Sequence, residues 1–100
     1  MDREYQAHVL VEAGEKHLHP GCIASMCTSR EQRQEQAKEC YEKAGNMFKL
    51  DKKWFESGEC YEKCGQICEA QQNQDYATRY FEDAVHCFSL SDDKKRNFLI

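Results

Sequence analysis

The chain has 100 residues, of which 40% are apolar and 32% are charged, with one proline and five glycines. This is the size and composition of one modest folded domain, and it excludes collagen-like and low-complexity chains. Fourteen Lys and Arg residues against eighteen Asp and Glu residues give a formal net charge of -4, which disfavours nucleic acid as a main partner.

The N-terminal segment predicts one helix followed by a long loop. We expect the first helix near 2–18. The run His19-Pro20-Gly21 ends this helix, because proline lacks an amide donor and glycine accepts a left-handed backbone. We therefore expect a loop over 19–30. The segment lacks the apolar stretch of a secretory signal, so we expect a cytosolic location.

A repeat of twenty residues organises the rest of the chain. Residues 39–45 read ECYEKAG and residues 59–65 read ECYEKCG, so six of the seven positions are identical. Small or apolar positions recur at spacings of three and four, which is typical of one buried helical face. We expect helices near 31–50, 52–72 and 74–90, with a fifth beginning after residue 92. Short turns between such helices make neighbours antiparallel.

Two pairs of residues have the spacing of a capping box at the start of the second helix. Thr28 with Glu31, and Ser29 with Gln32, each combine a hydroxyl with a carboxylate or amide three residues later. Either pair could satisfy the free amides of a helix that begins near residue 31.

Glycines and aromatic residues also recur in the repeat. Gly45 and Gly65 lie inside expected helices, where we interpret them as points of close helix approach. Tyr41, Tyr61 and Phe81 recur at the same register and predict packing between helices. The predicted fold class is therefore all-α, a tetratricopeptide-like α-solenoid of antiparallel helix hairpins with a right-handed twist. We expect residues 1–100 to form a single helical-repeat domain.

The cysteines allow two interpretations. Seven cysteines, an odd number without a secretory signal, predict free thiols. Cys60, Cys64 and Cys68 share one helical face, and with His86 and Cys87 on the next helix they are compatible with a zinc or redox site. The repeat instead aligns Cys64 and Cys68 with alanine and phenylalanine in the other copies, and free cysteine is often buried. We favour core packing, with no metal and no cofactor.

The middle of the chain resembles a known family. The run AGNMFKL at 44–50, followed by Lys52-Lys53-Trp54 and Gly58, is similar to the N-terminal part of the alpha/beta type of soluble NSF attachment proteins. Segments 9–16 and 76–84 are also similar to that family. The resemblance implies that the chain is the N-terminal part of a longer helical-array protein.

The resemblance also implies a function. Proteins of this family are non-enzymatic adaptors that coat the SNARE four-helix bundle and recruit the ATPase N-ethylmaleimide-sensitive factor, which dismantles the bundle in vesicle-mediated transport and membrane fusion. The ATPase contact belongs to the C-terminal part of the longer family members. No glycine-rich phosphate loop or nucleophile motif suggests an enzyme. A helical-repeat module that binds peptides is the main alternative, and a cysteine-based zinc or redox protein is the second.

The resemblance implies a SNARE-binding site at Lys52, with Lys49 and Lys53 beside it. SNARE bundles are acidic, so lysines that face the bundle would steer binding and lose strength as salt rises. The alternative is that these lysines only complement the dipole at a helix C-terminus.

The resemblance further implies peripheral membrane contact by the loop at 21–27. In this chain the apolar residues of the loop include Cys22, Ile23, Met26 and Cys27, in place of the aromatic residues of the family. We therefore expect a cytoplasmic, peripherally membrane-associated protein with weakened membrane affinity. The alternative is a loop that packs back over the first hairpin.

Overall fold

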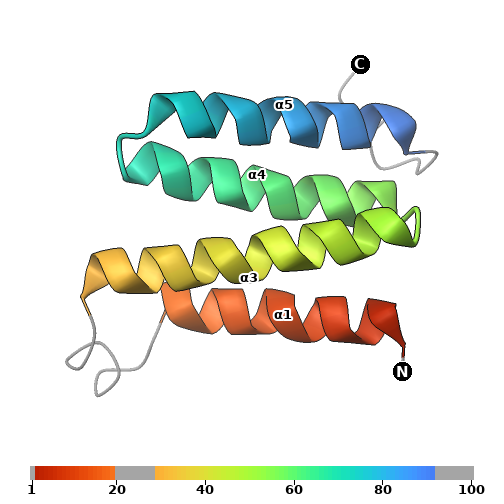
Figure 1. Ribbon diagram of the computed structural model, residues 1–100, viewed down its shortest axis with the longest axis horizontal. Helices are drawn as coiled ribbons and strands as arrows, with labels where there is room; N and C mark the ends of the chain where they lie inside the picture. The colour runs from red at the N-terminus through yellow and green to blue at the C-terminus, as the bar shows by residue number, and fades with distance from the viewer. Residues whose placement is uncertain (1, 20–28, 92–100) are drawn as a thin grey trace.

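The computed structural model describes residues 2–19 and 29–91. Its helices are α1 (Arg3–Leu18), α3 (Arg30–Leu50), α4 (Trp54–Ala70) and α5 (Gln74–Leu90). Each helix runs antiparallel to the one before it, and the described part of the chain contains no strand (Figure 1). The predicted all-α array of antiparallel hairpins is confirmed. The helix expected after residue 92 lies outside the described residues.

Side-chain caps fix where three of the helices begin. The Asp2 carboxylate accepts a hydrogen bond from the Glu4 amide at 3.0 Å and caps α1. Ser29 and Gln32 form the full capping box at the start of α3, as one of the two expected pairs predicted. Thr28, of the other pair, lies outside the described residues. Asn73 caps α5. These contacts satisfy amides that have no partner within their own helix.

The turn between α3 and α4 is a Schellman motif without glycine. The Lys53 amide donates to the Phe48 carbonyl at 2.8 Å, and the Lys52 amide donates to the Lys49 carbonyl at 3.0 Å. This pattern requires a left-handed residue after the helix, usually glycine. Here Lys52 takes that conformation, with a φ of 60°.

The turn between α4 and α5 repeats this geometry twenty residues later. The Asn73 amide donates to the Cys68 carbonyl, and the Gln72 amide donates to the Glu69 carbonyl, both at 2.9 Å. Gln72 has a φ of 61°. The helix expected over 52–72 is therefore two residues shorter at each end, because both flanking segments form turns.

Small residues at equivalent repeat positions form the core between the helices. The set in one register is Ala37, Ser57 and Ala77, and the set in the other is Ala44, Cys64 and Ala84; all six side chains are buried. The Ser57 hydroxyl donates to the Gly45 carbonyl at 2.8 Å, which satisfies this buried polar group. The repeat therefore marks the buried face of each helix.

Aromatic rings of one helix cover glycines of the helix before it. A Cβ atom added at Gly45 would lie 3.0 Å from the Tyr61 ring, and one added at Gly65 would lie 2.7 Å from the Phe81 ring. Tyr41 covers Gly14 of α1 in the same way, at 3.0 Å. The predicted roles of Gly45 and Gly65, and of the three aromatic residues, in helix packing are confirmed, whereas the contact at Gly14 was not predicted.

Candidate functional site

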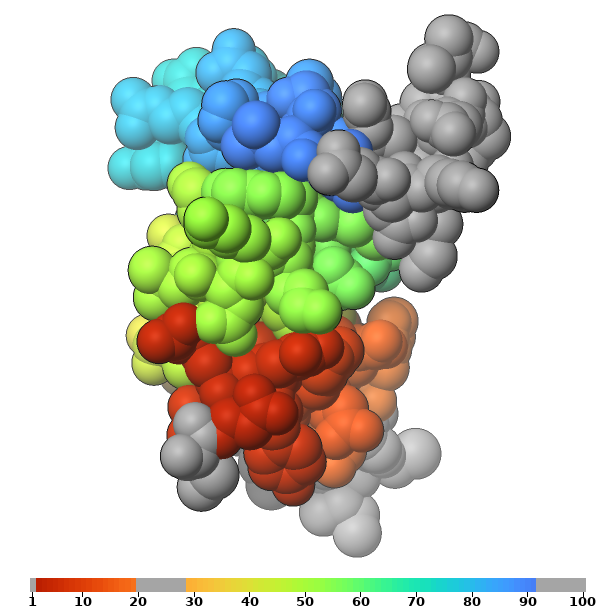
Figure 2. Space-filling model, turned by 90° about the vertical axis from the view of Figure 1, so that its right-hand side faces the viewer, coloured from red at the N-terminus to blue at the C-terminus, as the bar shows by residue number. Residues whose placement is uncertain are grey.

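Three lysines lie together where α3 turns into α4. Lys49, Lys52 and Lys53, here called the lysine turn, are all exposed. Figure 2 looks onto this end of the array, where the N-terminal turn of α1 lies against the α3–α4 hairpin. The sequence predicted the three lysines as a group, and the fold adds the start of α1 beside them.

Lys49 is positioned by an aromatic ring of the next helix. Its ammonium nitrogen lies 5.8 Å from the centroid of the Tyr61 ring, within the range of a cation–π contact. The Tyr61 hydroxyl donates to Asn46 Oδ1 at 2.6 Å and so fixes the ring. Lys49 therefore presents a charge whose position α4 restrains.

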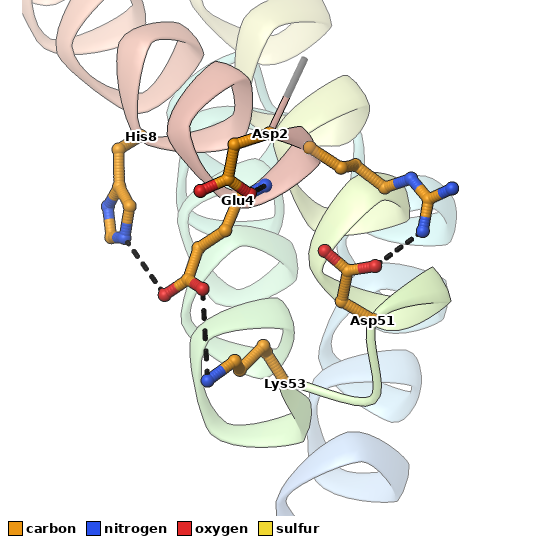
Figure 3. Close-up of polar contacts among 6 residues, drawn as sticks. Asp2, Glu4, His8, Asp51 and Lys53 are labelled. Atoms are coloured by element: carbon orange, nitrogen blue, oxygen red, sulfur yellow. Dashed lines mark hydrogen bonds and ion pairs between the residues drawn. The ribbon is translucent and has the colours of Figure 1, made fainter.

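Two residues of α1 form ion pairs with residues of the turn (Figure 3). The Lys53 ammonium lies 3.9 Å from a Glu4 carboxylate oxygen, and Arg3 pairs with Asp51. The other Glu4 oxygen lies 3.8 Å from His8 Nε2. Local sequence spacing did not indicate the two ion pairs between α1 and the turn, because each joins residues about fifty positions apart. The antiparallel course of α1 and α3 was the one signal that could have placed them together.

Lys52 differs from its two neighbours. No carboxylate among residues 2–19 and 29–91 forms an ion pair with it, whereas Lys53 is paired with Glu4. Lys52 also occupies the left-handed position of the turn. Gln72 has the same backbone conformation in the next turn, so the conformation alone does not distinguish Lys52 as functional. Its side chain is exposed at the end of the array where α3 turns into α4.

Replacing Lys52 with glycine is expected to stabilise the fold. The left-handed conformation is unfavourable for residues with a Cβ atom, so Lys52→Gly should raise the free energy of unfolding by about 0.5–1 kcal/mol. Gln72→Gly should have a similar effect, since both residues have the same φ. Urea denaturation of the two variants measures this. A loss of stability in both variants would contradict the turn geometry.

The cysteines of α4 lie in the core. Cys64 and Cys68 are fully buried and Cys60 is 4% exposed. The Cys64 thiol donates a weak hydrogen bond to the Lys38 carbonyl at 3.5 Å. In the described segments no group of three or more His, Cys, Asp or Glu side chains could hold a metal ion. The core interpretation of these cysteines is confirmed, and the described geometry does not support the zinc alternative.

Burial of thiols and phenols predicts loss of stability at alkaline pH. Burial raises the pKa of Cys60 from 9.0 to about 12, and the pKa values of Tyr41 and Tyr61 from 10.0 to about 12. In the unfolded chain these groups ionise from about pH 9, so the folded state then binds more protons. Its stability is complete below that pH and falls as the pH rises toward 12. Cys60 alone should contribute a loss of about 1 kcal/mol near pH 10.

Urea denaturation at neutral pH and near pH 10, with reducing agent present, measures this loss. The Cys60→Ala variant is the control, because it should show a shallower pH dependence than the parent chain. A free energy of unfolding that stays constant over this range would contradict the burial of these groups.

The predicted membrane loop lies outside the described residues. This applies to Cys22, Ile23, Met26 and Cys27, which therefore remain predictions. Among the helices of the described segments, none is both long and apolar enough to cross a membrane.

Comparison with known proteins identifies the family of the chain. The family model described as "Soluble NSF attachment protein, SNAP" matches residues 5–97. No curated protein and no solved structure matches the chain at a significant level. The matched range includes all of the lysine turn and nearly all of the helical array.

Proposed function

Because this chain belongs to the soluble NSF attachment protein family, we propose that it is a non-enzymatic adaptor for SNARE complexes. In this role it binds the SNARE four-helix bundle and links it to the ATPase N-ethylmaleimide-sensitive factor. The adaptor works by shape and charge complementarity and has no catalytic step. We further propose that it acts in the cytoplasm, in peripheral contact with membranes through the segment at 21–27.

The observation that carries the proposal is the exposed charge of the lysine turn. Lys52 has no acidic partner among the described residues, and Lys49 is held in place by the Tyr61 ring. A positive group that no internal carboxylate neutralises is available to an acidic partner. Lys53 contributes less, because Glu4 already neutralises part of its charge.

The test is binding of the chain to an immobilised soluble SNARE bundle at low and at moderate salt. We expect the Lys49→Glu/Lys52→Glu variant to bind at least about tenfold more weakly than the parent chain. The loss should be largest at low salt, because exposed charges are screened as ionic strength rises. Lys52→Gln should weaken binding more than Lys53→Gln.

A matched control makes the same two Lys→Glu substitutions at positions outside the lysine turn. Lys16 lies near the end of α1, at the opposite end of the array, and Lys43 lies within α3; both are exposed. The Lys16→Glu/Lys43→Glu variant should bind like the parent chain. Equal losses in both double variants would indicate a general charge effect and reject the lysine turn as the site. Binding by neither variant nor parent would reject the adaptor function for this chain.

A further inference from the structure

A groove lies between α1 and α4, above the face of α3 on which both helices pack. It has a volume of about 420 Å³. Its floor is apolar: Val11 is partly exposed there, and Tyr41, Phe48 and Cys60 lie beneath it with at most 4% of each residue exposed. We call this feature the acidic groove, because its rim carries the carboxylates of Glu15, Glu56, Glu59 and Glu62.

Most of the charge on the rim is not neutralised within the described structure. The ion pairs seen there involve none of Glu15, Glu56 and Glu62. Lys63 is the one lysine that lines the groove, against four carboxylates. The pKa of Cys60 is raised first by burial and then by the nearby Glu59 and Glu56 carboxylates, which agrees with a negative potential at the floor.

The carboxylates lie on both sides of the apolar floor. Glu15 belongs to α1, whereas Glu56, Glu59 and Glu62 follow one another along α4. Glu62 lies six residues after Glu56, which corresponds to about 9 Å along the helix. An occupant that satisfies both sides must present an apolar stripe flanked by positive charges. That is the surface of an amphipathic basic helix, in which apolar anchors recur every three or four residues.

We propose that the acidic groove binds a basic, amphipathic helical segment of a partner protein. The inference is independent of the proposed SNARE contact, because an acidic bundle would be repelled by this rim. A small polycation such as spermine would complement the negative charge of the rim but would provide no apolar anchors for the floor. The groove and the lysine turn would then select partners of opposite charge on one short array.

The experiment is a titration of the full chain into a fluorescein-labelled peptide of leucine and lysine whose leucines have helical spacing, followed by fluorescence anisotropy. The Glu15→Gln/Glu56→Gln/Glu62→Gln variant should bind this peptide at least about tenfold more weakly. The control variant is Glu12→Gln/Glu69→Gln/Glu82→Gln, which neutralises three exposed carboxylates that do not line the groove. It should bind the peptide with the affinity of the parent chain.

Two further measurements locate the peptide and define its class. Amide chemical shifts should change around Val11, Glu15 and Gln66, and circular dichroism should show that both triple variants remain folded. A scrambled peptide of the same composition should bind more weakly than the helical one. The proposal is overturned if the peptide does not bind, if the scrambled peptide or spermine binds as tightly, or if the two triple variants lose affinity equally.

Discussion

Phe48→Ala is expected to lower the free energy of unfolding by about 3–5 kcal/mol, the usual result of deleting a buried aromatic ring. Phe48 is 2% exposed and packs with Ala7 of α1, Ala44 of its own helix and Cys60 of α4. The His8 ring meets it edge-on, with 5.1 Å between the centroids. The substitution would therefore leave a cavity where three helices meet. Since a small domain has a total stability of about 5–15 kcal/mol, this is a large share.

Urea denaturation measures this loss, and Leu50→Ala is the matched control. Leu50 lies two residues later in the same helix but is 70% exposed, so its truncation should change the stability by less than about 0.5 kcal/mol. Similar losses in the two variants would show that Phe48 is not a core residue and would contradict the packing of α1 against α3.

Gly65→Val is expected to cost about 3 kcal/mol, at the upper end of the range for overpacking. A Cβ atom at this position would lie 2.7 Å from one carbon of the Phe81 ring and 2.8 Å from the next. The ring must move, and α5 moves with it. Gly65→Ala should cost less, because alanine regains about 1 kcal/mol of helix propensity.

The neighbouring residue provides the control for this prediction. Gln66 is exposed, so Gln66→Val changes the helix propensity without introducing an atom between α4 and α5. Its cost should stay below about 1 kcal/mol. Thermal denaturation followed by circular dichroism ranks the variants. If Gly65→Val melts at the same temperature as Gln66→Val, the close approach of α4 and α5 is wrong.

The sequence predicted the architecture because the same physical pattern occurs three times. Ala44, Cys64 and Ala84 occupy the same position in successive copies of the repeat, and all three are buried. A helical face made of such small residues is typical of a face that packs against another helix. The capping box was also readable, since Ser29 and Gln32 carry the required groups at the required spacing.

The helix ends and the surroundings of the lysines were less predictable. The turns lack the glycine that usually marks a left-handed position, so nothing in the sequence indicated that Lys52 and Gln72 would adopt it. The contact between Lys53 and Glu4 depends on how α1 is aligned along α3, which local spacing does not determine. The acidic groove was missed for the same reason, since its two sides come from α1 and α4.

The succession of helix contacts has a kinetic consequence. Extensive contacts within the described segments join only helices that follow one another: α1 with α3, α3 with α4, and α4 with α5. Such local contacts give a low contact order, which favours folding in microseconds to milliseconds. The array can also open from its ends. We therefore expect amide hydrogens of α5 and α1 to exchange with solvent faster than those of α3 and α4, each of which is covered by helices on two sides.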